Sequence, residues 1–133
     1  EESALRTERD QASHLAAWTV FCPELQDGEP RDGVFVKNSS PSAVYNVVIE
    51  SNDREGGRRA PLKMSIAPPG DFLIRSNRTY HWAFPISPAE VGSAIRPITK
   101  QVDWQVTSVS FTDAQGTHWR REGALLSRVN DQP

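Results

Sequence analysis

Residues 33–51 read GVFVKNSSPSAVYNVVIES and carry the strongest strand signal in this chain of 133 residues. Valine, isoleucine and aromatic side chains favour a pleated, half-buried backbone, whereas the polar NSSPSA in the middle is typical of a turn. In the second half, Tyr45, Val47 and Ile49 alternate onto one face of the expected strand. The stretch therefore predicts two strands joined by a turn.

The same alternation recurs in short segments that are separated by turn-forming residues. A change of apolar register within residues 102–111 also predicts a bulge near Thr107. No helical pattern lies between the segments, which argues against strand–helix–strand units. We expect an all-β fold, an antiparallel immunoglobulin-like β-sandwich of about seven or more strands. Besides the two strands above, the expected strands are 18–22, 62–67, 72–74, 79–84, 102–111, 117–121 and 124–129.

The N-terminal residues, EESALRTERDQASHLAA, contain no glycine or proline and are mostly good helix formers. They predict one α-helix at 1–17, either packed on the domain or acting as a stalk, followed by a β-sandwich domain at 18–133. Leu5, Ala12 and either Leu15 or Ala16 fall near one face of this helix. A stalk of this kind also offers a surface for homo-oligomerisation.

Composition narrows the class of protein. The 15 basic and 17 acidic residues leave a net charge of -2, which gives no support for nucleic-acid binding. Cys22 is the single cysteine, so no intrachain disulfide holds the fold. No apolar run is long enough for a membrane span. The chain begins at Glu1 and not at methionine, which leaves open a membrane anchor upstream of residue 1.

The titratable residues give no catalytic or metal-binding pattern. His14, His81 and His118 lie far apart in the sequence, without HxH or HExxH spacing. Neither a glycine-rich phosphate loop nor a GxSxG elbow is present. We therefore expect no metal, no cofactor and no catalytic residues. The enzymatic alternative is a small hydrolase-like site built from His81, His118 and Asp113.

Residues 111–123, FTDAQGTHWRREG, have the composition of a β-hairpin. Asp113 and Gly116 suit the first and last positions of a type I turn. Alternation along the returning strand then predicts that Trp119 is a core residue. By the same alternation, His118 and Arg120 are expected to face solvent.

Aromatic and arginine side chains are the best candidates for binding, because both are enriched among the dominant contacts of protein interfaces. Two arginines lie in the polar loop 52–60, and an alternating tyrosine and tryptophan lie on the short segment 79–84. The histidine and arginine on the outward face of the hairpin complete the set. The candidate binding residues are Arg58, Arg59, Tyr80, Trp82, His118 and Arg120.

Three quoted segments, VFVKNSSPSAVYNVVIE, IAPPGD and VSFTDAQGTHWRR, resemble turns of bacterial, actinobacterial-like immunoglobulin-like or fibronectin type III-like sandwich domains. The resemblance covers about residues 33–129 and departs from antibody-type domains, whose paired cysteines are missing here. It implies a sandwich joined by a charged helix to a membrane segment, and hence a membrane-associated or extracytoplasmic location in a bacterium. It implies no catalytic residues.

These observations predict a non-enzymatic interaction or ligand-sensing module. In this interpretation a β-sandwich on a helical stalk binds a protein partner. The alternative is carbohydrate or small-molecule binding through exposed aromatic side chains.

Overall fold

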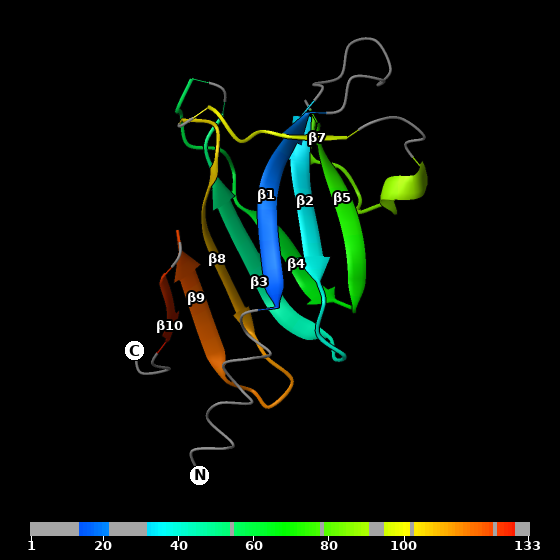
Figure 1. Cartoon of the computed structure of the whole chain (residues 1–133), viewed down its shortest axis with the longest axis vertical. Helices are drawn as coiled ribbons and strands as arrows, with labels where there is room; N and C mark the ends of the chain where they lie inside the picture. The colour runs from blue at the N-terminus through cyan, green and yellow to red at the C-terminus, as the bar shows by residue number, and fades with distance from the viewer. Residues whose placement is uncertain are drawn as a thin grey trace.

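The computed structural model of the chain is a sandwich of two antiparallel sheets, each with five strands (Figure 1). It describes residues 14–21, 32–53, 55–77, 79–90, 95–101, 103–123 and 125–129. Sheet A has the order β6-β5-β2-β1-β7, and its strands in chain order are β1 Leu15–Phe21, β2 Asp32–Asn38, β5 Gly70–Asn77, β6 His81–Trp82 and β7 Arg96–Pro97. Sheet B has the order β10-β9-β8-β3-β4, and its strands are β3 Val44–Ser51, β4 Leu62–Ala67, β8 Val106–Thr112, β9 His118–Glu122 and β10 Leu125–Arg128. A short 3₁₀ helix, η1 Pro88–Glu90, follows β6.

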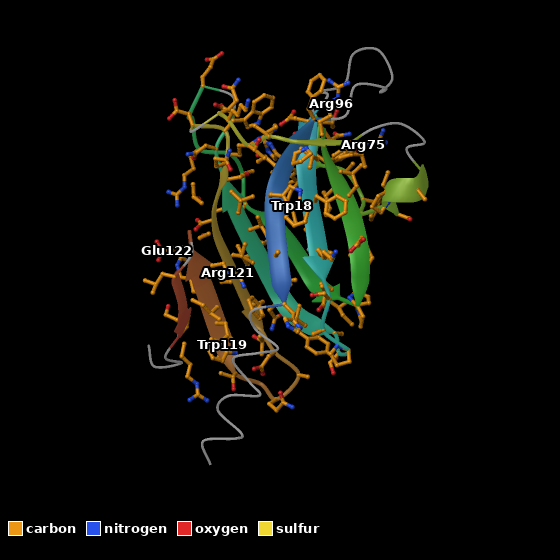
Figure 2. All side chains as sticks on the ribbon, viewed as in Figure 1. Trp18, Arg75, Arg96, Trp119, Arg121 and Glu122 are labelled. Atoms are coloured by element: carbon orange, nitrogen blue, oxygen red, sulfur yellow. The ribbon has the colours of Figure 1, made fainter. Side chains whose placement is uncertain are left out.

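The main core lies between the two sheets. Figure 1 shows β1, β2 and β5 in front of β3, β4 and β8. Each strand directs alternate side chains inward, as the period of two in a strand requires. On the side of β9, Arg121 donates from Nη1 to the backbone oxygen of Leu15 at 2.5 Å, which ties sheet B to β1 (Figure 2). The core residues are Leu15, Val34, Val36, Val44, Val47, Ile49, Leu62, Met64, Ala67, Ile74, Val109, Phe111 and Trp119.

A second, smaller apolar cluster surrounds Val20 and Leu73. Trp18, at the middle of β1 (Figure 2), stacks on Phe35 of β2 with 4.9 Å between the ring centroids and 15° between the planes. In β1 and β2 these residues alternate with residues of the main core, so this cluster covers the outer face of sheet A. Sheet A is therefore apolar on both faces, which explains its sequence runs of consecutive apolar residues.

The predicted helix at 1–17 is wrong at its C-terminal end. Residues 15–17 belong to β1, where Leu15 pairs with Asn38 and Ala17 with Val36. Leu and Ala are good helix formers, but burial of Leu15 in the core and pairing with β2 outweigh that local preference. The predicted boundary between 17 and 18 therefore falls inside a strand. Residues 1–13, on which the stalk and its oligomerisation depend, lie outside the described part of the chain.

No helix among the described residues has the length and apolar character needed to cross a membrane. The described part contains ten strands, where the sequence predicted about seven or more. Two of the ten, β6 and β7, are only two residues long. Such short pairings carry little periodicity of their own, and the sequence predicted no strand at the position of β7.

Two bulges shape sheet B. The predicted bulge at Thr107 is confirmed, because Glu50 pairs with Ser108 whereas the next residue, Ser51, pairs with Val106. A second bulge was not predicted and lies at Asn46, which has a positive φ of 51°. It reverses the alternation of β3, so Val47 and Ile49 are buried while Tyr45 is exposed. The expectation that these three residues share one face is therefore wrong.

Candidate binding site

An apolar cleft opens between the sheets at the edge where β4 lies opposite β5 and β6. It encloses about 750 Å³ and we refer to it as the edge cleft. Apolar atoms dominate its walls, which is typical of surfaces that bind ligands or other proteins. Its lining residues are Leu62, Lys63, Met64, Ile74, Asn77, Tyr80, Trp82, Ala83, Phe84 and Pro85.

Two aromatic side chains project from the rim of the edge cleft. Tyr80 is 77% exposed and Phe84 is 90% exposed, so neither contributes much to the folded core. Tyr80 follows a turn that Asn77 stabilises, because Asn77 Oδ1 accepts hydrogen bonds from the backbone N–H groups of Thr79 and Tyr80 at 2.9 and 2.8 Å. The position of Tyr80 is therefore set by local backbone structure and not by burial of its ring.

A bulge presents Phe84. The Ala83 N–H donates to the Arg75 oxygen at 2.8 Å, and further along Leu73 and Ile86 exchange both backbone hydrogen bonds. Between these two pairings β5 advances by two residues and the neighbouring segment by three. The additional residue falls at Phe84 or Pro85, and proline has no N–H to continue the ladder. At this irregularity the Phe84 ring lies in solvent.

Trp82 forms part of the cleft wall and is held by contacts with two residues outside the lining. Its Nε1–H donates to the Ala60 oxygen at 2.9 Å. The Arg59 guanidinium lies 4.9 Å from the ring centroid, within the range of a cation–π contact. Both partners come from the loop between β3 and β4, so that loop sets the orientation of the indole.

Arg59 itself is fixed by sheet A. Its Nη1 lies 2.5 Å from Asp32 Oδ2 on β2, and its Nη2 donates to Ser76 Oγ on β5. The side chains of Arg59 and Asp32 are mostly buried, so this ion pair is shielded from solvent. The hydrogen bonds to Asp32 and Ser76 hold the planar guanidinium of Arg59 in one orientation. Arg59 can therefore fix the position of the Trp82 ring that it contacts.

Arg58 and Arg120 meet at a different place, on the outer face of sheet B. Arg58 Nη2 lies 2.9 Å from Glu50 Oε2, and Arg120 Nη2 lies 3.4 Å from Glu50 Oε1. Ser108 Oγ donates to Glu50 Oε1 at 2.6 Å. This hydrogen bond is the main cause that lowers the pKa of Glu50 below its ordinary value, and the two arginines act in the same direction.

The hairpin expected at 111–123 is confirmed, and its aspartate supports the turn. Asp113 is 1% exposed. Its Oδ1 accepts from the N–H groups of Gln115 and Thr117, and its Oδ2 accepts from Trp119 Nε1, each at 2.9 Å. Trp119 is buried as predicted. These contacts occupy both carboxylate oxygens with groups of the hairpin itself.

The members of the hydrolase-like alternative are distributed over both sheets. The Nδ1 of His118 lies 2.7 Å from Thr112 Oγ1 on the neighbouring strand, whereas His81 lies on β6 of the other sheet. The prediction that His118 and Arg120 face solvent holds only in part, since both are half-buried. Among the described residues, no group of three or more His, Cys, Asp or Glu side chains is arranged to hold a metal ion.

The six candidate binding residues therefore fall into three places. Tyr80 and Trp82 line the edge cleft and Arg59 contacts the Trp82 ring, Arg58 and Arg120 share Glu50, and His118 contacts Thr112 on the hairpin. Sequence reasoning missed Phe84, although an aromatic residue directly before a proline in a short strand is a signal for an exposed bulge. It also missed the contribution of β4, since Leu62 and Met64 look like ordinary core residues in the sequence.

Comparisons with known proteins identify no relative of the chain. No family model matches the chain, and neither a curated protein nor a solved structure matches it.

Proposed function

We propose that this chain is a non-enzymatic interaction module that binds a protein partner through the edge cleft. The observation that carries the proposal is the pair of exposed rim aromatics, Tyr80 and Phe84, beside the indole of Trp82, which Arg59 holds in place. Large apolar side chains left in water favour association, because burying them in an interface removes apolar surface from solvent. Tyrosine and tryptophan are also enriched among the residues that dominate binding energy.

The exposure of the rim favours a protein over a small ligand. A small molecule inside the cleft would contact Leu62, Met64 and Trp82 but would leave much of the 90%-exposed Phe84 ring in water. A protein surface that covers the cleft also covers its rim. Because Trp82 is already held in place in the free protein, its side chain loses little entropy on binding, which favours a higher affinity.

Carbohydrate or small-molecule binding is the second candidate. The cleft volume of about 750 Å³ supports it, because small-molecule sites commonly enclose a few hundred to a thousand Å³. Screening of a glycan array and a small apolar fragment library tests this candidate. A binder whose affinity falls with Met64→Leu but not with Phe84→Ser would favour a ligand inside the cleft over a protein on its rim.

For the fold we propose the immunoglobulin-like or fibronectin type III-like arrangement. Two antiparallel sheets that face each other across one apolar core support it. The absence of paired cysteines is compatible with the fibronectin type III-like form.

Site-specific photocrosslinking tests the binding function. Phe84 is replaced by the photoreactive p-benzoylphenylalanine, and the protein is irradiated in an extract of cells that express the chain. We expect a discrete protein adduct that weakens when Tyr80→Ser is added. The matched control carries the same group at Leu125, which is 71% exposed on β10 at the opposite edge of sheet B. Equal adducts from both positions, or none from position 84, would show that the edge cleft is not the binding surface.

A further inference from the structure

The edge cleft is bordered by an edge strand. β4 ends the order of sheet B, and within the described part of the chain it pairs on one side only, with β3. An edge strand presents a row of N–H and C=O groups that can pair with another extended chain. In sheet A the corresponding edge of β5 is covered, because residues 81–86 pair along it. Of the two strands that end the sheets here, β4 offers the longer regular edge, with six residues against two in β6.

The side chains of β4 connect this backbone edge to the edge cleft. Leu62 and Met64 point into the core and line the cleft, whereas Lys63 and Ser65 are exposed. A strand that pairs with β4 repeats this alternation, since directly opposed residues of paired strands lie on the same face. Its residues i and i+2 then enter the cleft beside Met64, between sheet B and the rim aromatics Tyr80 and Phe84.

The length of the accessible edge is bounded by prolines. Pro61 precedes β4 and Pro68 follows it, and neither has an N–H for pairing. The six residues of β4 can thus pair with a segment of about the same length. Prolines at both ends also limit indefinite edge-to-edge association, so the site suits one short strand.

The charge of Lys63 indicates which kind of residue lies between the two apolar residues of the incoming strand. Among the lining residues that the structure describes, Lys63 is the one charged residue, and its side chain is exposed. Opposite charges on directly opposed positions of paired strands stabilise the pairing, whereas like charges oppose it. We therefore expect aspartate or glutamate at the position of the incoming strand that faces Lys63.

We infer that the partner contributes an extended peptide segment that adds to β4 as a further strand of sheet B. Two large apolar side chains at i and i+2 enter the edge cleft, and an acidic residue pairs with Lys63. This inference rests on the proposed binding function and names its occupant. Backbone pairing supplies affinity, and the cleft and Lys63 supply specificity, as in other strand-addition interfaces.

A random twelve-residue peptide library displayed on phage and selected on the immobilised chain tests the inference. We expect enriched peptides with an apolar–x–apolar pattern and an acidic residue near it. Fluorescence anisotropy with the synthetic peptides should show at least a tenfold loss of affinity with Phe84→Ser. Lys63→Glu should cause a similar loss, and exchanging the peptide's acidic residue for lysine should restore binding to Lys63→Glu. Both substitutions lie at exposed positions, which keeps the fold intact.

Peptides that are N-methylated at one amide at a time report on the backbone pairing itself. We expect a period of two, in which alternate methylations weaken binding at least tenfold and the others leave it within about twofold. Peptides that need Phe84 but show no such period would overturn strand addition while the proposed function stands. If no peptide is enriched, or if position 84 crosslinks to a second copy of the chain, strand addition by a partner segment is also overturned. Failure of the photocrosslinking experiment would instead reject the proposed function.

Discussion

The guanidinium of Arg59 lies 4.9 Å from the centre of the Trp82 ring, while the same group contacts Asp32 and Ser76 of sheet A. One side chain from the β3–β4 loop thereby connects that loop to the opposite sheet and to the wall of the edge cleft. Arg59 is a positioning residue, because it acts on the binding surface through Trp82.

Replacing Arg59 with alanine should destabilise the fold and release Trp82. Asp32 would be left mostly buried without its partner, at a cost of about 2–3 kcal/mol in the free energy of unfolding. Urea denaturation measures this loss, and increased acrylamide quenching of the tryptophan fluorescence, with Trp82→Phe as the reference for the other three tryptophans, measures the release. Arg58→Ala is the matched control, because the Arg58 side chain is 80% exposed and should change stability by less than about 0.5 kcal/mol. Equal effects of the two substitutions would contradict the role assigned to Arg59.

Asp113→Ala should be among the most destabilising polar substitutions in the chain. It removes the acceptor for the buried Trp119 indole N–H and for two backbone N–H groups of the turn. Leaving these donors unpaired should cost about 2–4 kcal/mol, measured as a lower urea midpoint. Gln115→Ala, at an exposed position of the same turn, should stay within about 0.5 kcal/mol of the unsubstituted protein. A small effect of Asp113→Ala would mean that water satisfies these donors.

Glu50 should make stability depend on pH. Its pKa in the folded state is lowered from 4.5, mainly by the hydrogen bond from Ser108 and further by Arg58 and Arg120. A depressed carboxylate pKa stabilises the folded state above the unfolded pKa, and this contribution is lost as the pH falls through the folded pKa. The stability difference between the unsubstituted protein and Glu50→Gln should therefore shrink as the pH is lowered from about 6 to about 3.

Ser108→Ala provides the control for this pH dependence, because it removes the largest cause of the lowered pKa of Glu50. Urea midpoints of this variant should vary less steeply below pH 4.5 than those of the unsubstituted protein. Parallel curves for Glu50→Gln and the unsubstituted protein would exclude Glu50 as the titrating group.

Asn46→Val should test the unpredicted bulge in β3. The φ of 51° at Asn46 is tolerated by asparagine and glycine but strains a β-branched residue. We expect a loss of about 2 kcal/mol for Asn46→Val and a change of less than about 1 kcal/mol for Asn46→Gly, both from thermal and urea unfolding. Ser65→Val, at an exposed position of β4 without a positive φ, should be nearly neutral. If Asn46→Val is neutral too, the bulge does not require the left-handed conformation.

Several predictions from the sequence needed only local information, and these are confirmed. The turn at Asp113 to Gly116 follows from residues that suit a type I turn. The bulge at Thr107 and the burial of Trp119 follow from alternation within a few residues. Antiparallel sheets follow from the same alternation combined with the absence of helical segments between strands.

Other features depend on pairing between distant parts of the chain and escaped sequence reasoning. Leu15 lies in a strand because β2 pairs with it across more than twenty residues, in spite of its helix-forming neighbours. Tyr45 is exposed because the bulge at Asn46 reverses the face of β3.

The edge cleft likewise combines features set by neighbouring residues with features set by contacts between distant parts of the chain. Short alternating strands, polar turns and an apolar core are properties of neighbouring residues, and the order of amino acids alone specifies them. The contact of Arg59 with Asp32 arises only when sheet A closes over sheet B, and the edge position of β4 and the exposure of Phe84 arise only from the pairing of strands. Burial and backbone pairing are properties of the folded chain, so only the tertiary structure reveals which aromatic side chains remain in solvent.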